Sequence, residues 1–169
     1  MPIPSPLIGW AVWGCLERHK QIELILLKGH LILEIVLGDC IARLSGEPGI
    51  DVSNHSFHGK TELLAKLLQR ANTESQGLLA LVRRLNTLRN RLAHEFKFED
   101  GEESLRNWSN SVLVTLPYVK LSKFTSRTRL IHAFASVGSA LSKLAEDPVV
   151  SVAHSPQLNP NPSRSTGFD

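Results

Sequence analysis

The chain has 169 residues, of which 42% are hydrophobic and 21% are charged, and its formal net charge at pH 7 is +3. Length and composition are those of one soluble globular domain that can bury a proper core. The mildly basic balance permits binding to a polyanion but does not by itself indicate it.

The few cysteines and the scattered histidines argue against a disulfide-rich protein and against a metal-binding protein. Cys15 and Cys40 cannot build a disulfide framework, and their apolar helical surroundings predict buried free thiols in a reducing cytoplasm. His55 and His58 share one loop but have no carboxylate or thiol beside them, so neither a metal site nor a cofactor is expected. The most apolar stretch, residues 22–41, is interrupted by charged residues, which excludes a membrane span.

Apolar residues at helical spacing predict an all-α, mainly antiparallel helical bundle of about five helices. A short helix over about 5–18 comes first. The longer ones are expected over about 21–44, 56–70, 77–96, 104–116 and 126–146. Residues 1–146 are therefore expected to form a single helical domain. Residues 147–169, rich in Pro, Ser and Asn, are expected to be a flexible tail.

Residues that cap or interrupt helices set the expected helix ends. Residues 45–49 end the second helix, Ser53 or Ser56 caps the third, residues 72–76 form a break, and residues 99–101 form a turn. Two glycines inside the second helix, Gly29 and Gly38, each weaken it by about 1 kcal/mol and are expected to mark close packing against another helix.

The end of the helical pattern over 77–96 carries an arginine, an amide and a histidine close together: Arg89, Asn90 and His94. Imidazole titrates near neutral pH, so His94 is the candidate general base or acid at an RNA 2′-OH. A guanidinium binds two phosphoryl oxygens at once, which makes Arg89 the candidate clamp for transition-state charge. Asn90 lies four residues before His94, where it can orient that histidine or hold a phosphate or base edge. The three residues predict a metal-independent endoribonuclease that leaves 2′,3′-cyclic phosphate ends.

The same Arg-x4-His spacing occurs again at Arg127 and His132. This second pair has no amide after its arginine and lies on a different helical pattern. We interpret it as a chance match.

With these residues in view, the chain resembles the HEPN superfamily. This family consists of small all-helical domains, many of which are ribonucleases of toxin–antitoxin and defence systems. Residues 89–94 fit the short form of the family's motif, an arginine followed at a short distance by a histidine. Residues 28–34 resemble the family's early core helix, and residues 56–63 resemble the start of the helix before the motif helix. The resemblance covers roughly residues 16–120, and its specific part is the motif.

One geometric difficulty leads to an expected assembly. An ideal helix places Arg89 and His94 about 140° apart around its axis and about 7.5 Å apart along it. The resemblance implies a homodimer in which two motifs face each other across a cleft. In one HEPN branch the antitoxin modifies a tyrosine two residues after the motif histidine, but here that position is Phe96 and the one tyrosine is Tyr118. A protein antitoxin that blocks the cleft, or no antitoxin, remains open.

Three further residues are candidates beside the motif. Lys60 and Arg91 are candidate RNA contacts. Glu34 interrupts an apolar helix face and is a supporting residue, with Arg89 as its partner or, alternatively, as an exposed side chain on the polar edge. Besides the ribonuclease, two other functions stay open. One is a non-catalytic helical module that binds RNA, a nucleotide or a protein partner. The other is a structural dimerisation or transcription-regulating partner.

Overall fold

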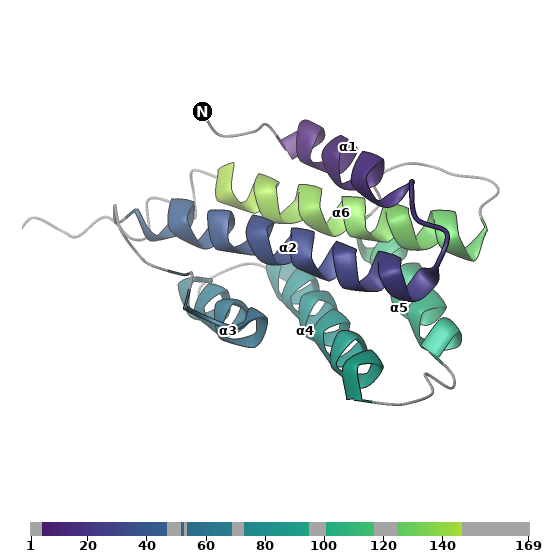
Figure 1. The fold of residues 1–169 in the computed structure, drawn as a ribbon. Coiled ribbons are helices and arrows are strands. Elements are labelled where there is room, and N and C mark those ends of the chain that lie inside the picture. Colours follow the sequence, from purple (N-terminus) through teal and green to yellow (C-terminus); the bar gives the residue numbers. More distant parts are fainter. Residues whose placement is uncertain are drawn as a thin grey trace, which may run out of the picture.

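The computed structural model describes residues 5–46, 52, 54–68, 73–94, 101–116 and 125–146. These residues form helices, with no strand among them, which confirms the expected all-α bundle (Figure 1). The helices are α1 (Ser5–Leu16), α2 (Ile22–Ser45), α3 (Phe57–Leu67), α4 (Thr73–His94), α5 (Gly101–Thr115) and α6 (Ser126–Glu146).

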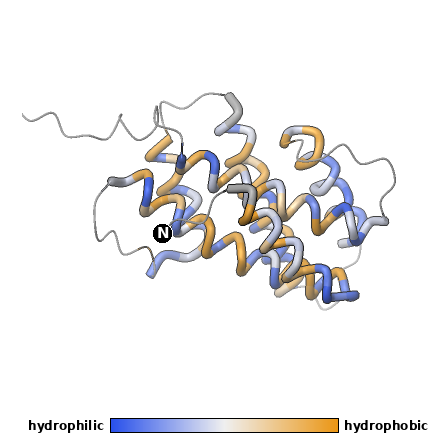
Figure 2. The backbone as a smooth tube through the Cα atoms, turned by 90° about the horizontal axis from the view of Figure 1, so that it is seen from above, coloured by the Kyte–Doolittle hydropathy of each residue, from blue (hydrophilic) through white to orange (hydrophobic). Residues whose placement is uncertain are grey.

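Helix α6 lies at the centre of the bundle, where α1, α2 and α5 all pack against it. Figure 1 shows α1 along one side of α6, with α3 and α4 on the opposite side of the molecule. The colours of Figure 2 alternate between hydrophobic and hydrophilic along the helices, as expected where one face of a helix is buried. The buried apolar side chains of α6 are Leu130, Ile131, Ala133, Phe134, Ala135, Val137, Leu141 and Ala145.

Close packing at a glycine joins α2 to α6. A Cβ atom at Gly29 would lie 2.6 Å from the ring of Phe134, so only glycine fits there without a shift of that buried ring. The expectation of close helix packing is thus confirmed at Gly29. At Gly38 the neighbour is Val52, in the connection after α2, rather than another helix.

The helix ends agree with the sequence signals in part. Gly46 ends α2 in the left-handed region at φ 63°, and the Ser56 side chain caps α3 by accepting from the Gly59 N–H at 3.2 Å. The expected break is wrong for residues 73–76, which form the first turn of α4, and the expected turn is wrong for Gly101, which begins α5. Short polar residues suit a loop and the first turn of a helix equally well, so their composition does not separate the two.

The two cysteines are free thiols, as expected, but they differ in exposure. Cys40 is buried, and this burial raises the pKa of its thiol to about 12. Cys15 is exposed, so the expectation of two buried thiols is wrong there. The buried face of α1 is centred between Val12 and Leu16, and Cys15 lies at its edge, about 60° from Val12 around the helix axis.

None of the helices in the described ranges has both the length and the hydropathy that crossing a membrane requires. The expectations for Phe96, Tyr118 and the tail over 147–169 fall on residues outside those ranges.

Candidate functional site

Helix α4 carries the motif and is held by neighbours on one side. It packs against α5, α3 and α2, and the Trp108 Nε1–H of α5 donates to the Leu81 carbonyl oxygen of α4 at 2.9 Å. The C-terminal end of α4 extends away from α1 and α6 at the lower edge of Figure 1. The buried apolar side chains of α4 are Leu78, Leu79, Leu81, Val82, Leu85 and Leu88.

The structure brings together two of the three motif residues. The Arg89 Nη1 atom donates to the Asn90 Oδ1 atom at 3.2 Å. His94 is the last residue of α4 and is exposed, whereas Arg89 is half-buried. Within the described part of the chain, no hydrogen bond or ion pair joins His94 to Arg89 or Asn90. The angular separation expected from helix geometry therefore persists in the folded chain.

A buried histidine lies beside Arg89 and was given no role by the sequence. The His30 ring is 6% exposed, stacks on Phe57 with centroids 4.0 Å apart, and its Nε2 atom lies 3.2 Å from Asn86 Oδ1. Burial lowers the pKa of His30; the bond to Asn86 opposes this change, the positive charge of Arg89 adds to it and the negative charge of Glu34 opposes it. A neutral ring with its proton on Nε2 satisfies the amide oxygen of Asn86.

An ion pair lies one helical turn from His30. Lys60 Nζ donates to Glu34 Oε1 at 3.1 Å, with the lysine side chain 10% and the glutamate side chain 30% exposed. The partner of Glu34 is thus Lys60, where Arg89 was the candidate. A phosphate contact by Lys60 would break this pair and leave a charge unpaired at a largely buried position, which is costly.

These side chains form one group, here called the polar cluster: His30, Glu34, Lys60, Asn86 and Arg89. They come from the middle of α2, the start of α3 and the second half of α4. The sequence analysis gave no role to His30, although one signal pointed to it. A histidine among the buried leucines of α2 needs a hydrogen-bond partner, as the carboxylate of Glu34 does.

The second Arg-x4-His pair has a visible structural use. The Arg127 Nε atom donates to the His19 carbonyl oxygen at 2.7 Å, and its Nη2 atom donates to the Glu17 carbonyl oxygen. These bonds tie the start of α6 to the connection between α1 and α2. Arg127 therefore acts as a brace between helices, which agrees with the interpretation of this pair as a chance match.

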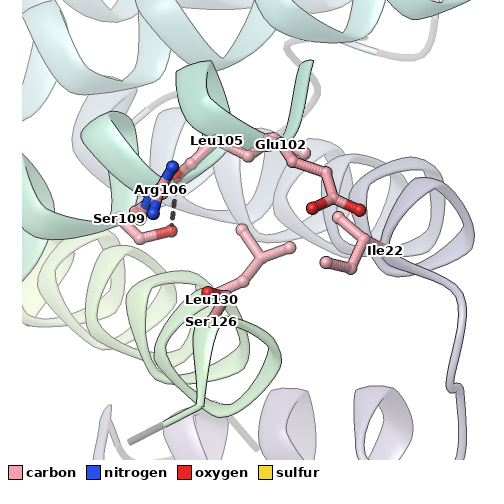
Figure 3. Close-up of a pocket in the computed structure, with 7 residues that line it drawn as sticks. All are labelled: Ile22, Glu102, Leu105, Arg106, Ser109, Ser126 and Leu130. Carbon is pink, nitrogen blue, oxygen red and sulfur yellow. Dashed lines mark hydrogen bonds between the residues drawn. The ribbon is translucent and has the colours of Figure 1, made fainter. Parts of the chain in front are cut away.

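A small hollow lies away from the motif, between α5 and the starts of α2 and α6. Figure 3 shows Ile22, Leu130 and the Glu102 carboxylate around it, with the Ser109 hydroxyl bonded to the Leu105 carbonyl oxygen. It has room for about one water molecule and is too small for a nucleotide. No group of three or more His, Cys, Asp or Glu side chains that could hold a metal ion occurs within the described ranges.

Comparisons with known proteins add no relative. No family model, no curated protein and no solved structure matches this chain. The likeness to HEPN proteins therefore rests on the residues of the chain itself.

Proposed function

We propose that this chain is a HEPN-type endoribonuclease that cleaves RNA without a metal ion. The observation that carries the proposal is the polar cluster. The His30–Asn86 hydrogen bond and the Glu34–Lys60 ion pair join α2, α3 and α4 there, the charge of Arg89 acts on His30, and His94 lies exposed at the end of the same helix as Arg89. Toxin or defence activity, a cytoplasmic location and control by a protein antitoxin belong to the same proposal.

The proposed reaction uses the 2′-OH of the RNA as its nucleophile. One imidazole takes the 2′-OH proton, the 2′ oxygen attacks the phosphorus, and the bond from phosphorus to the 5′ oxygen breaks. The leaving 5′ oxygen takes a proton from an imidazolium, so the products are a 2′,3′-cyclic phosphate and a 5′-OH. Arg89 stabilises the charge on the phosphoryl oxygens, and Asn90 holds its guanidinium from the side.

A homodimer suits this reaction because Arg89 and His94 point away from α4 in different directions. Two copies with facing motifs bring the histidine of one chain to the arginine of the other, and the imidazole that takes the 2′-OH proton then gives it to the leaving 5′ oxygen. Lys60 is excluded from this site by its ion pair, and Arg91 stays a proposed RNA contact.

The alternative is a helical module that binds RNA, a nucleotide or a protein partner without cleaving RNA. One observation favours it: Arg89 contacts Asn90 and acts on His30, whereas His94 has no bond to either motif partner within the described residues. Because Arg89 and His94 are not joined, the same arrangement also suits a site that binds a ligand without catalysing a reaction.

Cleavage in EDTA tests the proposal. Purified wild type is expected to cut a mixed RNA pool in EDTA and to leave cyclic phosphate ends. His94→Ala and Arg89→Ala are each expected to lower the rate by about 10²- to 10⁴-fold, because a proton-transfer group and a charge clamp make contributions of this size. His55→Ala removes another exposed histidine and should keep the wild-type rate. Bound but uncut RNA would support the alternative, and loss of cleavage in EDTA would contradict a metal-independent reaction.

A further inference from the structure

Positive charge is concentrated on one helix. Residues 75–94 of α4 contain four arginines and no Asp, Glu or Lys. The whole chain has a net charge of +3, so the residues outside this stretch sum to −1. With Glu74 in its first turn, α4 has a net charge of +3, and the residues outside α4 sum to zero.

The outward side of α4 presents most of this charge. The outer face of α4 is defined by Arg83, Arg84, Thr87, Arg91 and His94, all exposed except the half-buried Arg91. Arg84 and Arg91 lie about 20° apart around the helix axis and about 10.5 Å apart along it, and His94 lies about 80° around the axis and about 15 Å along it from Arg84. The row therefore leads to the candidate general base or acid.

The nearest carboxylate of α3 does not cancel this row. Glu62 accepts from Arg83 through both oxygens, at 2.9 Å to Nε and 3.2 Å to Nη2. The pKa of Glu62 is lowered, first by the hydrogen bond from Arg83, and also by the charges of Arg83, His58 and Lys66. Arg84 itself forms no hydrogen bond or ion pair with the residues that the structure describes, so its charge is available to a partner.

The chemistry of the outer face of α4 fits a phosphate backbone better than other polyanions. Every cation between residues 75 and 94 that is charged at pH 7 is an arginine, whose planar fork matches phosphate oxygens in pairs. The face has no large apolar side chain with which to enter a lipid surface or to form the centre of a protein interface. Charge complementarity alone therefore decides its partner.

We propose that the outer face of α4 binds the sugar–phosphate backbone of single-stranded RNA and guides it to His94, with Arg84 and Arg91 as phosphate contacts. The inference rests on the proposed function for the choice of RNA. It adds that affinity comes from the backbone, so binding is expected to be insensitive to base sequence and steeply dependent on salt.

Salt-dependent binding tests this surface. The His94→Ala chain, which should leave RNA uncut, is titrated with a labelled single-stranded RNA and with a scrambled RNA of equal length. Adding Arg84→Gln should reduce the slope of log affinity against log salt by about 0.7, and adding Thr87→Arg should increase it by about 0.7. Arg106→Gln, an exposed arginine on α5, removes the same charge elsewhere and should leave the slope unchanged.

The outcomes separate this inference from the proposed cleavage. Equal slopes for Arg84→Gln and Arg106→Gln would overturn the RNA surface, even if wild type cuts RNA. Binding of polyglutamate or of anionic vesicles in place of RNA would also overturn it. If wild type binds RNA with the expected slope and never cleaves it, the surface stands and the ribonuclease proposal fails.

Discussion

His30 joins the candidate site to the core through a single hydrogen bond. Its ring lies between Phe57 and Asn86, so α2, α3 and α4 meet at one residue. Removing one partner of a buried hydrogen bond costs about 1–3 kcal/mol, more than the bond itself contributes. Loss of the His30 side chain would therefore weaken the attachment of the α4 segment that carries Asn86 and Arg89.

The first prediction concerns pH. Because the pKa of folded His30 lies below 6.5, the neutral ring stabilises the fold fully above pH 6.5. As the pH falls below 6.5 the unfolded chain takes up the proton first, and stability is lost until the pH reaches the lower folded pKa. Urea unfolding of wild type should show this loss as the pH falls below 6.5, and His30→Gln should show a smaller loss.

The comparison of wild type with His30→Gln isolates the contribution of the His30 imidazole. The pKa of His132 is also lowered by burial, but His132 is present in both proteins and its contribution cancels. Identical losses of unfolding free energy in wild type and His30→Gln would show that His30 is not held neutral by the fold.

The sequence identified several residues of the site individually, but it did not predict which of them contact each other. Glu34 stood out as a carboxylate on an apolar face, but its partner Lys60 lies 26 residues away on another helix. His30 and Asn86 are 56 residues apart. Periodicity shows which face of a helix is buried, and it contains no information on which two faces meet.

At the scale of the element, the packing of α2 against α6 depends on the absence of a Cβ atom at Gly29. Alanine is about 1 kcal/mol better than glycine inside a helix, so Gly29 weakens α2 in isolation. The contact with the fully buried Phe134 ring reverses this preference, because a methyl group 2.6 Å from an aromatic carbon overpacks the junction of α2 and α6.

The second prediction uses a matched pair of glycines. Gly29→Ala should lower the free energy of unfolding by about 1–3 kcal/mol through overpacking. Gly14 lies at an exposed position of α1, with nothing within 4 Å of the new methyl group, so Gly14→Ala should raise the free energy of unfolding by up to about 1 kcal/mol. Urea midpoints of the two variants measure both effects. Stabilisation by Gly29→Ala would mean that Phe134 moves aside at little cost.

The helices themselves follow from local patterns, whereas their first turns do not. The apolar stripe of α4 follows from the spacing of its leucines, and the structure buries Leu78 and Leu85. Residues 73–76 were expected to be a break because they are polar, yet they begin α4. Such residues satisfy the free N–H groups of a helix start, and only the neighbouring helices decide whether the turn forms.

At the scale of the whole molecule, the two sides of α4 separate two tasks. The inner side joins the polar cluster, and the outer side presents arginines to the solvent. Arg89 belongs to the first side and His94 to the second. A single chain therefore offers the proposed clamp and the proposed base in different directions, which is the reason for proposing a dimer.

Mixing two inactive variants tests this shared site. His94→Ala keeps the arginine, and Arg89→Ala keeps the histidine. If each site takes its arginine from one chain and its histidine from the other, a mixed dimer contains one complete site. Random exchange in an equal mixture makes half of the dimers mixed, so the mixture should recover about a quarter of the wild-type cleavage rate. Sites built within one chain would leave the mixture as inactive as its parts. A concentration-dependent mass of wild type in solution checks that dimers form and exchange, and a strictly monomeric wild type that still cleaves RNA would contradict the shared site.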